Sequence, residues 1–189
     1  MCELDYGNPY ELLAATILSA QATDVSVNKT TPNLFQRFPD PESLSVADVE
    51  EVETYINSIG LFRGKAKNLV GMAQRLVDDF DSHVPETMAD LVSLPGVGRK
   101  TANVVRSVAL GLPGLPVDTH VGRLTRRLGI TDETDPVKVE LELNPMVPAI
   151  ERGDFSLRVI LHGRRVCFAR KPNCAECVLS YFCPVAFIA

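Results

Sequence analysis

The sequence predicts an all-α protein of about ten helices arranged in two lobes. Apolar residues recur at helical spacing along most of the chain, and no segment alternates for long enough to indicate a β-sheet. Capping residues, prolines and glycines separate the apolar segments at short intervals. With 189 residues, 46% of them apolar, the chain is long enough to bury a substantial core.

The first helices are marked by the residues that begin them. Asn8-Pro9 is a cap followed by a proline in the first turn, and an apolar face runs from Leu12 to Ala20. We expect Asp24 to cap a second helix that Pro32 breaks or kinks. Asp40-Pro41 is expected to start a short third one.

The remaining helices follow the same punctuation. Ser45 with Asp48 three residues later is a capping-box pattern for a helix that runs to about Ser58, which Gly60 ends. Further helices are expected over residues 65–80, 86–92, 99–110, 119–128, 136–150 and 154–163. The Gly- and Pro-rich stretch 111–116 is the expected crossing between lobes, which gives one domain over 1–112 and another over 113–189.

The distribution of charge matters more than its sum. The net charge of −5 argues against a nucleic-acid partner, yet eleven of the nineteen basic residues lie in the windows 95–129 and 155–173. Those windows contain one acid, Asp118, while acids gather over 40–53 and 78–90. Charges more than about 10 Å apart are screened, so a polyanion responds to the local patch. The sequence therefore leaves room for a nucleic-acid-binding face.

Neither a membrane span nor a targeting segment is visible. No run approaches the ~18 consecutive apolar residues that a membrane span needs. The N-terminus has neither the basic start nor the apolar stretch of a signal peptide. We therefore expect a cytoplasmic protein.

A glycine hairpin precedes the helix expected at residue 99. Gly96 and Gly98 in Leu94-Pro95-Gly96-Val97-Gly98 allow backbone conformations that other residues avoid. The free N–H groups of the following helix suit a phosphate oxygen, although many such turns only connect two helices. Arg99 and Lys100, which come next, favour the phosphate.

Four cysteines lie close together near the end of the sequence. Cys167, Cys174, Cys177 and Cys183 have the spacing C-x6-C-x2-C-x5-C. In a chain with intracellular character this pattern indicates a metal site rather than disulfides. Zinc and an iron–sulfur cluster both accept four thiolates. The fifth cysteine, Cys2, is expected to be an ordinary small residue.

Five segments together resemble the endonuclease III family, over about residues 6–184. LPGVGRKTANVV (94–105) resembles the helix-hairpin-helix motif of that family, and VDTHVGR (117–123) resembles its second signature. LSAQATD (18–24) resembles its early signature, and IGLF (59–62) matches the segment that supplies an apolar wedge. The cysteine spacing resembles the [4Fe–4S] loop of endonuclease III and its adenine-specific relatives.

The resemblance implies a bacterial DNA glycosylase with lyase activity, associated with the nucleoid, that removes oxidised pyrimidines from duplex DNA. Lys100 would attack C1′ of the damaged nucleotide, displace the base and leave a Schiff base, and β-elimination would cut the strand 3′ to the lesion. An ordinary lysine, with a pKa of about 10.4, is neutral in roughly one molecule in a thousand near neutral pH. Asp118 would assist the lysine as well as cap a helix. His120 is expected to be a structural hydrogen bonder.

The resemblance also implies the DNA contacts and the cofactor. A helical barrel domain would carry the hairpin, whose amides grip the DNA backbone, and a smaller domain would hold a [4Fe–4S] cluster on the four cysteines. Gln21 would fill the gap left by the extruded nucleotide, and Leu61 would act as the wedge. The DNA-binding residues are then Gly96, Gly98, Arg99, Gln21, Leu61, Arg170 and Lys171. The last two would face phosphates from the loop that the cluster pins.

Alternative functions are less well supported. An adenine-specific mismatch glycosylase shares the cluster spacing, but it usually has another residue at the position of Lys100. A non-catalytic DNA-binding module would not need both Lys100 and Asp118, and a structural zinc protein is the third alternative.

Two departures from the family are expected. The additional N-terminal helix is short or absent, and Pro32 interrupts a helix that relatives often continue. We expect a monomer.

Overall fold

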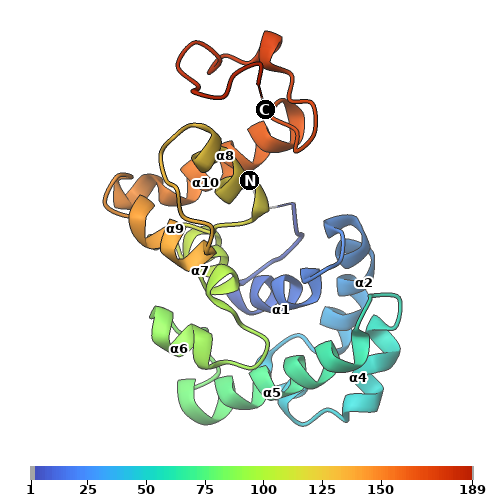
Figure 1. Ribbon diagram of the computed structural model, residues 1–189. Helices are drawn as coiled ribbons and strands as arrows, with labels where there is room; N and C mark the ends of the chain where they lie inside the picture. Colours follow the sequence, from blue (N-terminus) through green and yellow to red (C-terminus); the bar gives the residue numbers. More distant parts are fainter. Residues whose placement is uncertain (1–2, 189) are drawn as a thin grey trace. The chain divides into compact units, whose positions relative to one another are not determined.

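The computed structural model describes residues 3–188, and these residues form helices, turns and loops with no strand (Figure 1). The predicted all-α fold is confirmed. No helix in the described part is both long and apolar enough to cross a membrane. The chain divides into two compact units, the first ending at Leu112 and the second beginning at Pro113. Cys2 lies outside the described residues.

The first unit is built around a buried helix. Its helices are α1 (Pro9–Ser19), α2 (Asp24–Arg37), α3 (Pro41–Ser45), α4 (Val49–Ile56), α5 (Phe62–Phe80), α6 (Met88–Ser93) and α7 (Arg99–Val108). Every residue of α1 from Leu12 to Leu18 is buried. Helices α2, α5 and α7 pack against α1, while α3 and α4 pack against α5. A helix that is apolar all round is one that other helices enclose, and α1 is such a helix.

The second unit has a smaller core. Its helices are α8 (Thr119–Arg127), α9 (Pro136–Leu143) and α10 (Arg152–Arg165), with short 3-10 helices η1 (Ala149–Glu151) and η2 (Cys174–Glu176). Its buried apolar residues are Leu115, Val117, Val121, Val139 and Leu143. Helix α10 packs against α8. After α10 the chain is irregular apart from η2 (Figure 1).

The start of α1 is confirmed, whereas α2 departs from expectation at two places. Asn8 caps α1 by accepting from the backbone N–H of Glu11. Thr23, not Asp24, caps α2, because its hydroxyl accepts from the backbone N–H of Ser26. Pro32 does not end α2, which continues to Arg37. Pro32 is exposed, and buried residues on both sides of it, such as Thr31 and Leu34, keep the helix on the core.

Two other expected helices are shorter than predicted. Ser45 ends α3, and Asp48 is itself the residue before α4, so the expected capping box is wrong. The helix expected over 136–150 ends at Leu143, and η1 follows after a break. Pro145 and Pro148 explain the break, because proline lacks an N–H and keeps the residue before it out of the helical region.

Candidate active site and cysteine-lined pocket

The glycine hairpin is anchored by its apolar residues and exposes its glycines. Leu94 and Val97 belong to the core of the first unit, and the N–H of Val97 donates to the carbonyl of Leu94 at 3.1 Å. Gly96 has a φ of +78°, and a Cβ atom there would lie 2.9 Å from Cβ of Asn68 on α5. Only glycine satisfies both the conformation and the space. The backbone of the turn is thereby held at the surface.

The start of α7 follows directly and has no side-chain cap. Gly98 precedes the helix in an extended conformation and has open space where a Cβ would be. Because Gly98 has no side chain, nothing on this residue covers the positive end of the α7 dipole. Arg99 is half-buried and Lys100 is exposed in the first turn.

Asp118 caps α8 in the second unit and is held in one orientation. Its Oδ1 accepts from the backbone N–H groups of His120 at 2.8 Å and Val121 at 2.9 Å. Its Oδ2 lies 3.0 Å from Nδ1 of His120. The structural role expected of His120 is thus seen as a contact to Asp118. Lys100 belongs to the first unit and Asp118 to the second.

Two exposed turns in the first unit carry the residues expected to enter DNA. Gln21, after α1, has a φ of 56°, and Leu61, directly before α5, has a φ of 61°. Both side chains are exposed, and Leu61 is 67% exposed. An exposed, unpacked leucine in the left-handed region is uncommon, which points to a role outside the fold. Sequence patterns alone favour a core position for such a residue.

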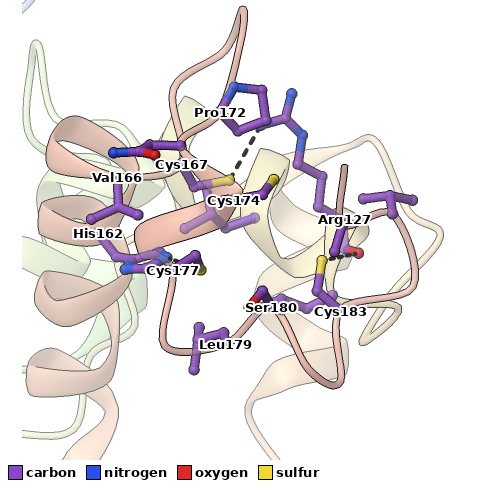
Figure 2. A pocket seen from close by; sticks show the side chains of 15 residues that line it. Arg127, His162, Val166, Cys167, Pro172, Cys174, Cys177, Leu179, Ser180 and Cys183 are labelled. Atoms are coloured by element: carbon purple, nitrogen blue, oxygen red, sulfur yellow. Dashed lines mark hydrogen bonds between the residues drawn. The ribbon is translucent and has the colours of Figure 1, made fainter. Parts of the chain in front are cut away.

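The four cysteines of the second unit line one pocket. All four are free thiols of intermediate burial. Figure 2 shows them around a space to which His162 and Arg127 also contribute. That space, its open mouth and the solvent in it included, is about 440 Å³.

The four thiols offer the donor set of a metal centre. Within residues 3–188, no group of three or more His, Cys, Asp or Glu side chains is close enough to hold one metal ion. A [4Fe–4S] cluster takes four separate thiolates, and four thiols spread around an apolar pocket match that donor set.

Arg123 and Arg127 hold the cysteine loop. The Arg127 guanidinium donates to Sγ of Cys167 at 3.2 Å and to the carbonyls of Phe168 at 2.7 Å and Ala169 at 3.0 Å. Arg123 donates to the carbonyls of Gly163 and Cys167 at 3.2 and 2.9 Å.

Both arginines lie in the basic window 95–129, which was interpreted as part of a nucleic-acid-binding face. Their role in holding the cysteine loop was not predicted. Their spacing of four residues on α8 places them on one side of the helix, which was the available signal. Arg126 is exposed, and so are Arg170 and Lys171 in the loop.

Two further contacts complete the surroundings of the pocket. Nε2 of His162 lies 3.4 Å from Sγ of Cys177, and Sγ of Cys183 donates to the backbone carbonyl of Arg127 at 3.5 Å (Figure 2). Arg127 therefore contacts both the first and the last of the four cysteines. Sequence reasoning did not single out His162.

Two family models match the chain. The one described as HhH-GPD superfamily base excision DNA repair protein covers residues 14–149. The one described as the iron-sulfur binding domain of endonuclease III covers residues 167–183, from the first to the last cysteine of the pocket.

Individual relatives and solved structures agree with these models. The chain is 53% identical to the endonuclease III of Synechocystis sp., over 98% of this chain and 85% of the relative. It is 45% identical to the endonuclease III of Escherichia coli, over 96% and 86%. A trapped endonuclease III–DNA covalent intermediate is similar with a TM-score of 0.91 and 44% identity, over 97% of this chain and 87% of the other. A thermostable thymine-DNA glycosylase is similar with a TM-score of 0.85 and 27% identity, over 94% and 83%.

Proposed function

This chain belongs to the endonuclease III family, within the HhH-GPD superfamily of base-excision DNA repair proteins, and from that membership we propose which of its residues act and how. It is a DNA-binding glycosylase with AP lyase activity, and its cofactor is a [4Fe–4S] cluster. The relatives are endonuclease III proteins, so the adenine-specific and non-catalytic alternatives are set aside.

Lys100 is the proposed nucleophile. Its position in the first turn of α7, exposed and directly after the exposed glycines of the hairpin, is the observation that carries the proposal. A DNA backbone bound at Gly96, Gly98 and Arg99 would bring a sugar to the amine. The nitrogen lone pair forms a bond to C1′ while the bond to the base breaks, and the base leaves with the electron pair. Ring opening gives the Schiff base, and loss of the proton on C2′ expels the 3′ phosphate.

Asp118 is the proposed proton acceptor for the lysine. A carboxylate offers about four lone-pair positions, and three of them are used by His120 and Val121 within the described residues. One position on Oδ2 is left for a proton. Because Lys100 is exposed in the free protein, we propose that bound DNA desolvates the amine and so completes its activation.

The proposed DNA contacts lie in both units of the chain, and the proposed cluster ligands lie in the second unit. We propose that the unit ending at Leu112 is the barrel domain with the hairpin, and that the unit beginning at Pro113 is the cluster domain. Gln21 and Leu61 would enter the duplex, and Arg170 and Lys171 would contact phosphates. Cys167, Cys174, Cys177 and Cys183 would each give one thiolate to the cluster, which supplies a structural anchor when bound. We further propose that the protein removes oxidised pyrimidines, as a monomer, at a bacterial nucleoid.

Borohydride trapping tests the lysine assignment. Duplex DNA with one oxidised pyrimidine is incubated with the holoenzyme and reduced, and the covalent adduct is resolved by gel electrophoresis. We expect an adduct with the unaltered chain and none with Lys100→Ala. Base release without any trapped adduct would contradict the assignment. A panel of oxidised pyrimidines, oxidised purines and abasic sites then ranks the lesions.

A further inference from the structure

A buried lysine joins the two turns that carry Gln21 and Leu61. Lys65 lies one turn into α5 and is 5% exposed. Its Nζ donates a hydrogen bond of 2.8 Å to the carbonyl of Leu18, which is 47 residues away and in the last turn of α1. Leu18 is three residues before Gln21, and Leu61 is four residues before Lys65. One side chain thus links the first turn of α5, which follows Leu61, to the last turn of α1, which precedes Gln21.

Packing alone does not explain a lysine at this position. A buried ammonium group is costly unless it is paired, and lysine is seldom buried without a counter-ion. Among residues 3–188, Lys65 has no carboxylate within ion-pair distance, and burial lowers its pKa. Its compensation is a single carbonyl at the negative end of the α1 dipole. An apolar side chain of the same length would fill the space without that cost.

Each of the two turns contains a residue in the left-handed backbone region. Gln21 and Leu61 have positive φ values, which cost side-chain-bearing residues free energy unless their surroundings fix them. The backbone N–H of Lys65 also donates to the carbonyl of Leu61 at 3.2 Å, which closes the first turn of α5. Lys65 is therefore bonded on one side to the turn of Leu61 and on the other to the end of α1.

We propose that Lys65 is a positioning residue that holds the Gln21 and Leu61 turns together, so that the two side chains enter DNA as one rigid unit. This inference rests on the proposed role of Gln21 and Leu61 in filling and wedging the duplex. Extruding a paired base is costly, and a wedge that must first be ordered on binding performs it less well. An abasic site has no base to unpair, so it depends less on the wedge.

The test compares two substrates rather than two overall activities. Single-turnover base release is measured on a duplex in which the oxidised pyrimidine is fully paired, and strand cleavage is measured on a duplex with a preformed abasic site. For Lys65→Met we expect the rate of base release to fall at least about tenfold, because one charged hydrogen bond is lost. We expect the rate of cleavage at the abasic site to change less than about twofold. Lys65→Arg keeps the cation and its donors, and we expect it to recover most of the loss. Lys67→Met, an exposed lysine on the same helix, is the control and should leave both rates unchanged.

Two outcomes overturn the proposal. Equal losses on both substrates, in Lys65→Met or in Lys65→Arg, would mean that Lys65 supports the fold or the active site in general. No loss on either substrate would mean that the turns hold their position without it. The adduct trapped on abasic DNA gives the folded, active fraction of each variant. If the unaltered chain forms no adduct, the proposed function fails; if it does and Lys65→Met does not separate the substrates, only this inference fails.

Discussion

The guanidinium of Arg127 donates a hydrogen bond to Sγ of Cys167, and the backbone carbonyl of the same arginine accepts one from Cys183. One residue of α8 is thereby bonded to both ends of the cysteine segment. A guanidinium beside a cluster thiolate is favoured, and groups that hold metal ligands in place affect how firmly the metal is retained.

Arg127→Ala should weaken retention of the cluster. The change removes three side-chain hydrogen bonds to residues 167–169, so we expect unfolding of the second unit to become easier by about 2 kcal/mol or more. The cluster's visible absorbance, followed during dilution with an iron chelator, should decay faster. Arg126→Ala, an exposed position on the same helix, is the control for lost charge. Equal decay in both variants would contradict the assignment.

Gly96→Ala and Gly98→Ala should have different effects. A Cβ on Gly96 meets Asn68 and demands a positive φ, so we expect a loss of about 1–3 kcal/mol in the free energy of unfolding. Gly98 has an ordinary φ and open space, so Gly98→Ala should fold normally. If the hairpin binds a phosphate, the added methyl group should still weaken DNA binding. Urea denaturation and DNA titration separate the two effects, and normal DNA affinity in Gly98→Ala would argue against backbone contact there.

Asp118→Asn should slow catalysis while the helix cap is kept. The asparagine oxygen still accepts from the N–H groups of His120 and Val121, but it does not take a proton from Lys100. We expect the single-turnover rate to fall about 100-fold with DNA affinity nearly unchanged. Asp118→Ala should lose the cap as well, at a cost of about 1 kcal/mol in stability. An unchanged single-turnover rate in Asp118→Asn would instead indicate that Asp118 acts only as a cap.

Lys65 should give the protein a characteristic alkaline response. Burial lowers its pKa below the usual 10.5, so between the lowered value and 10.5 the unfolded chain binds more protons than the folded one. The free energy of unfolding of the unaltered chain should therefore rise with pH in that window relative to Lys65→Met. Below the window both states are protonated and the difference is constant. Urea titrations of both proteins across alkaline pH measure it, and a difference that does not vary with pH would contradict the burial of the charge.

Arg170→Ala with Lys171→Asn should reduce the salt dependence of DNA binding. Both side chains are exposed, and Lys171 has a φ of 54°, a conformation that asparagine tolerates. If each contacts one phosphate, the slope of log affinity against log salt should fall by about 1.8 for the pair. Lys29→Ala, an exposed change on α2, should leave the slope as it was. An unchanged slope in the double variant would place the loop away from DNA.

Local signals in the sequence predicted most helices because their causes are local. Asn8 bonds to Glu11, three residues away, and such a cap can be read directly from the sequence. The continuation of α2 past Pro32 has a tertiary cause. Pro32 lacks one helical hydrogen bond, yet burial of Thr31 and Leu34 outweighs that loss.

The candidate site also has features that are visible locally in the sequence and features that depend on the fold. The hairpin and the cysteines were visible as motifs, and their resemblance to a family supplied the roles. The contact of Arg127 with residues 167–169 spans about 40 residues, and that of Lys65 with Leu18 spans 47. No local pattern specifies such a pair, because the fold brings the two residues together.

The left-handed backbone at Leu61 restricts which side chains could serve as the proposed wedge before any DNA is bound. Valine and isoleucine are apolar, but their branched Cβ atoms are poorly tolerated at positive φ. Glycine and asparagine accept the conformation but have no apolar side chain to insert. The variants that remain active at this position should therefore be few and unbranched at Cβ, such as methionine or phenylalanine. A ranking of substitutions by hydrophobicity alone would place valine and isoleucine too high.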